Sequence, residues 1–215
     1  DVLKYMGVNL DANLSRVKRC VEEAGIGFLF APLMHKAMKH AAIVRKELGF
    51  RTIFNVLGPL TNPACAQAQV LGVFDVKWVQ PLAQVLYGLG CKHAMVVHGS
   101  DGLDEITLTG ESHVAELRNG EVSNYNLDPR KLGFKTCSSV DLKGGTPEEN
   151  AGMIQNILNG ESGPKRDIVV LNSAAAIYVA GKVCSMEQGI QCAIDSIESG
   201  KARNKLEDLC RITCS

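Results

Sequence analysis

Apolar positions along the chain follow two alternating patterns. Between Val17 and Ala24 they recur at helical spacing, and Gly25 follows as a helix stop. The run at residues 94–97 instead has the length and composition of a buried strand in a parallel sheet. Because helical stretches and short apolar runs alternate, the pattern predicts an α/β fold, with a mostly parallel central sheet flanked by helices.

The remaining elements are predicted from the same patterns and from their end signals. Thr146 with Glu149 forms a capping-box pair before one helix, and Ser185 is the expected N-cap of another. The apolar stretch at 168–181 predicts a buried helix, although residues 168–171 also suit a strand. The expected strands cover residues 52–57, 69–74 and 94–97, and the expected helices cover residues 36–48, 77–89, 147–158, 168–181, 186–197 and 201–211.

A β-hairpin is predicted at residues 113–125. Two strand-like segments, 113–117 and 121–125, flank the dipeptide Asn119-Gly120. This dipeptide favours the positive φ angles of a type I′ turn. We therefore expect an antiparallel hairpin annex on the sheet.

Length and charge limit the class of protein. A chain of 215 residues suits a single α/β domain, residues 1–215. Basic and acidic residues number 23 each, so no basic surface for nucleic acid is expected. The longest apolar stretch, 168–181, is shorter than the roughly 20 residues of a membrane span. We expect no nucleic-acid partner and no membrane.

The eight cysteines favour a reducing compartment. They are scattered without any Cys-x-x-Cys pair, as is typical of reduced core residues, and a Cys210–Cys214 link or metal site is the alternative. No export-type apolar run opens the sequence, which suggests the cytoplasm. Because the chain begins at Asp1 and not at Met, we also expect an upstream portion.

Three carboxylates, Asp101, Asp104 and Glu105, follow the predicted strand at 94–97. Ligands of open α/β sheets bind beyond the carboxyl ends of strands, and clustered carboxylates suit Mg²⁺ shared with substrate phosphates. A solvated acidic turn with a helix cap explains the same spacing, and short acidic loops of that kind are more frequent.

Two further positions are candidate ligand contacts. Arg45 lies on an apolar stripe of the helix predicted at 36–48, where an arginine packs its stem, pairs with a buried acid or faces an anionic ligand. Pro59 lies in the turn at 58–63, which suits either a rigid ligand wall or a plain connector.

Several segments together resemble the anthranilate phosphoribosyltransferase family. They are Gly-Phe-Leu-Phe-Ala-Pro at 27–32, Asn-Val-Leu-Gly-Pro-Leu-Thr-Asn-Pro at 55–63, His-Gly-Ser-Asp-Gly-Leu-Asp-Glu at 98–105 and Leu-Asn-Ser-Ala-Ala-Ala at 171–176. The resemblance extends over essentially the whole chain, in the same order and spacing.

The resemblance implies transfer of phosphoribosyl from phosphoribosyl pyrophosphate to anthranilate, with release of pyrophosphate, in tryptophan biosynthesis. It implies that Asp104 and Glu105 ligate Mg²⁺ on the pyrophosphate and that Asp101 shapes the turn. It also implies that Arg45 faces the anthranilate carboxylate and that Pro59 lines the anthranilate channel.

The sequence departs from the family in what it lacks. The family's Gly-Thr-Gly-Gly-Asp phosphate loop and Lys-His-Gly-Asn segment do not occur in it, and Lys36 stands where the family usually has proline. We therefore expect a fragment of a longer two-domain enzyme that is inactive alone, and an intact homodimer formed through the missing N-terminal domain.

Two other functions remain alternatives. The first is a pyrimidine nucleoside phosphorylase of the same fold, which Arg45 and the Asp104-Glu105 pair argue against. The second is a non-catalytic α/β module that binds a metal or a partner.

Overall fold

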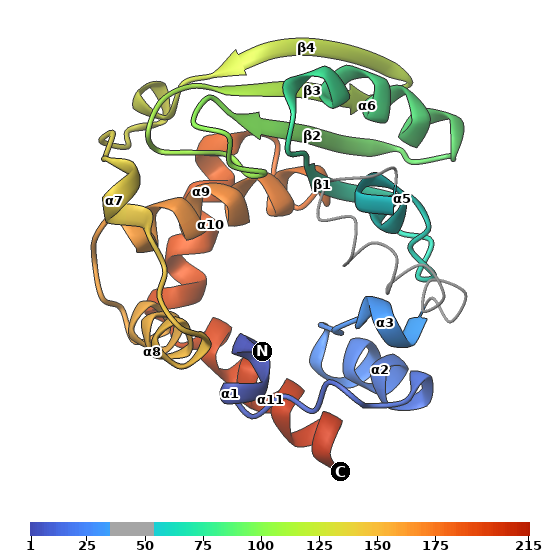
Figure 1. Cartoon of the computed structure of the whole chain (residues 1–215), viewed down its shortest axis with the longest axis vertical. Helices are drawn as coiled ribbons and strands as arrows, with labels where there is room; N and C mark the ends of the chain where they lie inside the picture. The colour runs from blue at the N-terminus through green and yellow to red at the C-terminus, as the bar shows by residue number, and fades with distance from the viewer. Residues whose placement is uncertain (35–53) are drawn as a thin grey trace, which may run out of the picture. The chain divides into compact units, whose positions relative to one another are not determined.

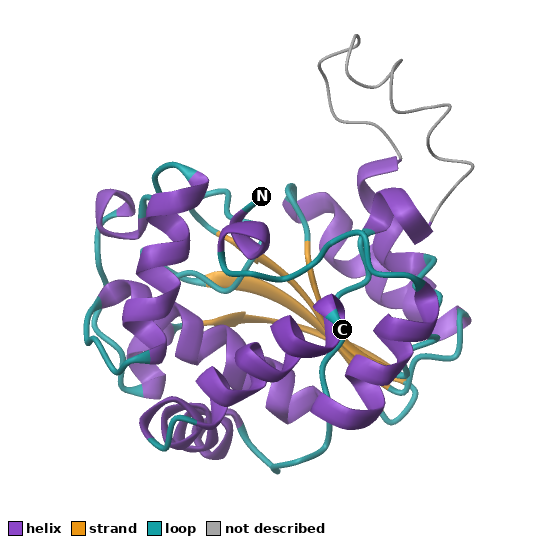
Figure 2. Cartoon of the chain, turned by 90° about the horizontal axis from the view of Figure 1, so that it is seen from below, coloured by secondary structure: helices purple, strands orange, loops and turns teal. Residues whose placement is uncertain are grey.

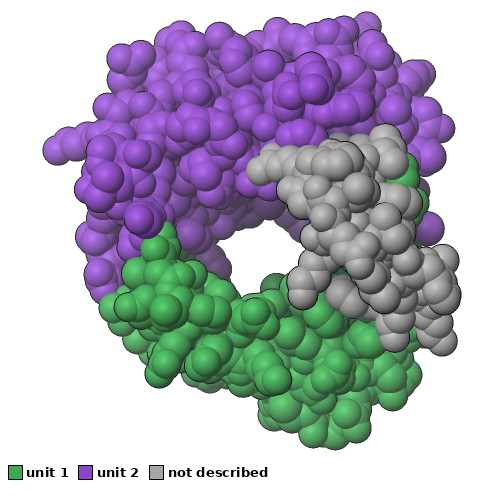
Figure 3. Space-filling view, in the orientation of Figure 1, with its two compact units in different colours: residues 1–63, 144–159, 197–215 green, residues 64–143, 160–196 purple. Residues whose placement is uncertain are grey.

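The computed structural model describes residues 1–34 and 54–215. It divides into two compact units, one made of residues 1–63, 144–159 and 197–215 and the other of residues 64–143 and 160–196 (Figure 3). The helix predicted at 36–48, with Arg45, lies outside the described residues. That residues 1–215 act as one α/β domain remains a prediction.

The second unit is built on a four-stranded sheet (Figure 1). Its strands lie in the order β1 (Ala68–Gly72), β2 (His93–Gly99), β3 (Ser112–Arg118) and β4 (Glu121–Leu127). Figure 2 shows the strands splaying from one another, as the twist of a β-sheet requires.

The α/β class is confirmed, and the sheet is mixed. β1 and β2 are parallel, whereas β2–β3 and β3–β4 are antiparallel. The expectation of a mostly parallel sheet is thus wrong for the described residues. A parallel neighbour requires a crossover, usually a helix, and residues 100–111, which join β2 to β3, contain none.

The hairpin is confirmed at the predicted turn. β3 and β4 pair from Ser112↔Leu127 to Arg118↔Glu121. Between them Asn119 has φ 53° and Gly120 has φ 82°, the two positive values of a type I′ turn.

The strand predicted at 52–57 is corrected for its described part, since α5 (Phe54–Leu60) is a helix. A short apolar run does not distinguish a strand from a helix, because periodicity needs more residues than the run provides. The backbone N–H of Thr61 donates to the carbonyl of Leu57 at 3.1 Å and ends the helix. Pro59 lies within α5 and not in a turn.

Two helices cover the sheet. α9 (Pro164–Val179) contacts β1 and β2, and α6 (Val79–Gly88) contacts β2 and β3. Residues 94–97 of β2 are all 0% exposed, so both faces of this strand are buried. The core cluster beneath α9 contains Met95, Val97, Ile106, Leu108, Val114, Leu127, Ile168, Leu171, Ala175, Tyr178 and Val179. Because α9 is helical throughout, a strand at 168–171 is excluded.

The predicted helix caps are present. Thr146 Oγ1 accepts from the N–H of Glu149 at 3.3 Å, and a Glu149 carboxylate oxygen accepts from the N–H of Thr146 at 2.7 Å. This capping box starts α8 (Pro147–Leu158). Ser185 Oγ accepts from Gln188 N–H at the start of α10 (Met186–Glu198), and α11 (Lys201–Cys214) follows Gly200.

The remaining elements are short or belong to the first unit. A cluster of Val8, Cys20, Ala24, Leu209 and Ile212 forms that unit's core. These elements are α1 (Val2–Tyr5), α2 (Leu14–Arg19), the π-helix η1 (Cys20–Ala24), α3 (Ala31–Met34), the 3-10 helices η2 (Val76–Trp78) and η3 (Pro129–Leu132), and α7 (Ser139–Leu142).

The eight cysteines all lie in the described residues, and none of them forms a disulfide, Cys210 and Cys214 included. A search of the described residues for a helix long and apolar enough to cross a membrane finds none.

Candidate functional site

The acidic loop lies at the carboxyl end of β2. Because β1 runs parallel to β2, both strands end at the same edge of the sheet. Gly72 is the last residue of β1, and a Cβ atom there would overlap the carbonyl oxygen of Asp104. The loop backbone therefore packs directly on the end of β1, where only glycine leaves room.

Asp101 is held by the loop itself. Its Oδ2 accepts from the hydroxyls of Thr107 and Thr109, both at 2.7 Å, and its Oδ1 accepts from the N–H of Leu103 at 3.2 Å. Burial alone would raise the pKa of Asp101, but the hydroxyls of Thr107 and Thr109 outweigh burial and lower it. Asp101 is thus an ionised carboxylate with its oxygens engaged, which suits the expected role in shaping the turn.

The far side of the loop is held from α9. Asn172 Oδ1 accepts from the N–H of Ile106 at 2.9 Å, and Asn172 Nδ2 donates to the Ile106 carbonyl at 2.8 Å. The Ile106 side chain is 0% exposed in the core cluster. The residue after Glu105 is therefore fixed through both its backbone and its side chain.

Asp104 and Glu105 are left between these two attachments. Both residues are exposed, and neither carboxylate has a hydrogen bond or ion pair with another residue in the ranges 1–34 and 54–215. Loss of hydration raises the pKa of Glu105, and the negative charges of Asp104 and Asp101 raise it further. A cation placed here would relieve that repulsion.

The pair suits Mg²⁺ as a partial site. Among the described residues no group of three His, Cys, Asp or Glu side chains could hold a metal ion. Mg²⁺ is usually bound by one or two protein carboxylates, with waters and substrate phosphates completing the octahedron. Asp104 and Glu105 fit that donor set, and they do not form a complete protein cage.

The other two predicted site residues do not belong to the described part of the second unit. Arg45 lies outside the described residues, and Pro59 is an exposed residue of α5 in the first unit. Sequence reasoning missed Gly72, Thr107 and the clamp made by Asn172. Asn172 had one sequence feature that could have revealed it, since with Ser173 it interrupts the apolar stretch at 168–181.

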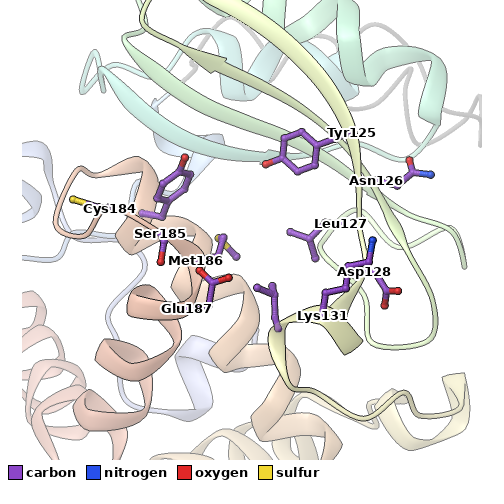
Figure 4. A pocket seen from close by; sticks show the side chains of 11 residues that line it. Tyr125, Asn126, Leu127, Asp128, Lys131, Cys184, Ser185, Met186 and Glu187 are labelled. Carbon is purple, nitrogen blue, oxygen red and sulfur yellow. The ribbon is translucent and has the colours of Figure 1, made fainter.

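A separate pocket of about 320 Å³ lies beside β4 (Figure 4). Tyr125 and Leu127 line one side of it, and the segment Cys184 to Glu187 lines the other. None of the predicted site residues lines it. The two hydroxyls at its inner wall are already engaged, because those of Tyr125 and Tyr178 donate to Glu116 at 2.9 and 2.8 Å.

Glu116 is the buried charge behind that pocket. It is 8% exposed and also lies 3.0 Å from Nε2 of His93. Burial raises the pKa of Tyr125 and of Tyr178, and the neighbouring Glu116 carboxylate raises both further. Both phenols therefore stay protonated as donors, and the network satisfies a buried carboxylate.

The described features define an α/β protein with a rigid carboxylate loop at the carboxyl end of its strands, where ligands of such sheets bind. The model of the glycosyl transferase family, a/b domain, matches residues 1–203. The chain therefore belongs to that family.

Among its relatives is the anthranilate phosphoribosyltransferase of Acetivibrio thermocellus, which is 56% identical over 215 residues, 100% of this chain and 62% of the relative. The crystal structure of anthranilate phosphoribosyltransferase from Thermus thermophilus superposes with a TM-score of 0.93 at 45% identity, over 100% of this chain and 64% of that one. The Saccharomyces cerevisiae enzyme in complex with PRPP and Mg gives a TM-score of 0.89 at 27% identity, over 99% and 62%. The chain thus spans under two thirds of each of these relatives.

Proposed function

We propose that this chain carries the metal-binding part of an anthranilate phosphoribosyltransferase. The observation that carries the proposal is a pair of carboxylates, Asp104 and Glu105, that have no partner among the described residues and lie on a loop fixed at both ends. The relatives of this name and the yeast complex with PRPP and Mg support it. The reaction would join the ribose carbon of phosphoribosyl pyrophosphate to the amine of anthranilate and release pyrophosphate.

The proposed roles follow from charge. Asp104 and Glu105 would hold Mg²⁺, and the metal would neutralise the charge that develops on the leaving pyrophosphate. The negative charges of Asp104 and Glu105 repel each other, and a bound cation would offset that repulsion. Arg45 would pair with the anthranilate carboxylate, and Pro59 would line the channel by which anthranilate enters. We also place the activity in the cytoplasm, within a homodimer.

Calorimetric titration of the chain with Mg²⁺ in the presence of pyrophosphate tests the metal assignment. Binding should fall at least about tenfold in the double variant Asp104→Ala/Glu105→Ala, because metal ligands and their neighbours affect affinity by that much or more. The matched control is Glu22→Ala/Glu23→Ala, which removes two adjacent exposed carboxylates from η1. Equal binding by the parent and the Asp104/Glu105 double variant would reject the assignment.

An assay of phosphoribosyl transfer tests the activity. We expect the 215-residue chain alone to be inactive, because the phosphate loop of the family does not occur in its sequence. Joining the preceding segment of the Acetivibrio relative to Asp1 should restore transfer to anthranilate. Phosphorolysis of a pyrimidine nucleoside, which forms the sugar phosphate and releases the free base, would instead favour a nucleoside phosphorylase.

A further inference from the structure

Asn172 uses every polar group of its side chain. Its Oδ1 accepts from the N–H of Ile106 at 2.9 Å, and its Nδ2 donates to the carbonyl of Ile106 at 2.8 Å and to that of Ile168 at 3.0 Å. If the side-chain amide were flipped, Nδ2 would face the N–H of Ile106 and Oδ1 would face the carbonyls of Ile106 and Ile168. Only one amide orientation therefore satisfies all three hydrogen bonds.

The contact with Ile168 makes this side chain rigid. Ile168 lies one turn earlier on α9, so the second amide hydrogen ties Asn172 to its own helix. The Ile106 backbone is thereby anchored to α9, which packs on β1 and β2. Ile106 held in this way cannot move unless the helix moves or the two hydrogen bonds that join it to Asn172 break.

The clamp acts next to the proposed metal ligands. Ile106 directly follows Glu105, while Asp101 holds the other end of the loop through Thr107 and Thr109. Asp104 and Glu105 make no such contact with the described residues, so their direction depends on the backbone on either side. Metal ligands are usually oriented by neighbours of this kind, and loss of one lowers metal affinity by roughly 10- to 100-fold.

We infer that Asn172 is a positioning residue, which orients Glu105 and Asp104 for the cation by clamping the backbone of Ile106. The inference rests on the proposed metal function of the loop. Asn172 touches neither the metal nor the substrates. It acts by preorganising the loop, so that the carboxylates need not be ordered when the cation binds.

Two variants separate positioning from packing. Asn172→Leu keeps the number and branching of the side-chain heavy atoms and loses all three hydrogen bonds, whereas Asn172→Asp keeps the acceptor for the Ile106 N–H and sets an oxygen against the two carbonyls. Both substitutions leave Asp104 and Glu105 in place, and only Asn172→Asp adds a carboxylate beside Ile106. We expect Asn172→Leu to weaken Mn²⁺ binding, measured with pyrophosphate present, by about 10-fold or more.

Hydrogen exchange at the Ile106 amide gives a readout that needs no metal. That N–H is bonded to Asn172 Oδ1, so it should exchange faster in Asn172→Leu and stay protected in Asn172→Asp. Faster exchange of the Ile106 amide shows that the clamp is lost, and the Mn²⁺ titration shows whether that loss reaches the carboxylates.

The matched control is Asn150→Leu. In α8 Asn150 makes the same two-point clamp, with Gly145 N–H donating to its Oδ1 at 2.8 Å and its Nδ2 donating to the Gly145 carbonyl at 3.2 Å. It belongs to the other unit. We expect this variant to lose less stability than Asn172→Leu, because its two hydrogen bonds are exposed, and to bind Mn²⁺ as the parent does.

The outcomes distinguish the two claims. If the parent binds Mn²⁺, Asp104→Ala/Glu105→Ala does not, and a folded Asn172→Leu binds as well as the parent, Asn172 has no positioning role and the metal site stands. If the parent and the Asp104/Glu105 double variant bind equally, the metal site itself is wrong, and the inference about Asn172 is lost with it. If Asn172→Leu does not fold, the folded Asn172→Ala decides, because it removes the same three hydrogen bonds without adding a charge, and unchanged Mn²⁺ binding in it overturns the inference.

Discussion

The Thr107 hydroxyl donates to Asp101 at 2.7 Å and accepts from the N–H of Thr109 at 3.1 Å. The side chain is 0% exposed, so neither contact is shared with bulk water. At the scale of single residues the acidic loop is therefore fixed by hydroxyl and amide groups, and its charges are placed by uncharged neighbours.

Thr107→Val should destabilise the chain by about 1–3 kcal/mol, because it leaves Asp101 and a buried N–H short of a partner. Thr107→Ser keeps the hydroxyl and should lose about 0.5–1.5 kcal/mol for the missing methyl. Urea unfolding of both variants measures the difference. A Val variant as stable as the parent would contradict the role assigned to this hydroxyl.

The hydrogen bond between Thr107 and Asp101 also makes the stability of the chain depend on pH. The pKa of Asp101 lies below its ordinary value of 3.8, since hydroxyl hydrogen bonds outweigh burial. A lowered carboxyl pKa stabilises the folded state above the ordinary value, and this stabilisation is lost as pH falls through the folded pKa. The difference in free energy of unfolding between the parent and Thr107→Val should thus be largest at neutral pH and should shrink below pH 3.8. The corresponding difference for Thr107→Ser should not change with pH.

Gly72 sets the approach of the loop to β1. Gly72→Ala would press a methyl group into the Asp104 carbonyl, which is backbone and cannot rotate away. We expect a loss of about 1–3 kcal/mol, typical of overpacking, together with weaker Mn²⁺ binding. Gly152→Ala, within α8 and with no atom within 4 Å of the added Cβ, is the control. The free energy of unfolding of Gly152→Ala, measured by thermal unfolding, should rise by up to about 1 kcal/mol.

At the scale of elements, end signals were more informative than apolar runs. The capping box at Thr146 and Glu149 and the type I′ turn at Asn119 appear where the sequence placed them. Both depend on a few neighbouring residues whose side-chain chemistry acts locally. Phe54 to Leu57 was predicted as a strand and is helical, because an apolar run fits either element and packing decides between them.

The hairpin turn is testable at this scale. Gly120→Ala should cost about 1–2 kcal/mol, since an alanine at φ 82° suffers the left-handed clash. Asn119→Gly keeps a residue that tolerates positive φ and should change stability by only a few tenths of a kcal/mol. Chemical unfolding measures both. Equal stability of the two variants would argue against the I′ geometry.

At the scale of the whole molecule, the chain forms two compact units and matches its family over residues 1–203. The sequence predicted the α/β class but not the mixed sheet, because strand direction depends on how residues 100–111 return the chain to β2. The first unit is assembled from three separate stretches, which no local pattern reveals.

The sequence by itself determined the elements with local chemistry, the family and the acidic loop at Asp101 to Glu105. Periodicity, caps and motif order encode these features over short distances. Only the tertiary structure decided how that loop is held. Asn172 lies 66 positions from Ile106 in the sequence, and Gly72 meets Asp104 only because β1 and β2 pair in parallel. Contacts between residues so far apart follow from packing, and spacing along the chain carries no record of them.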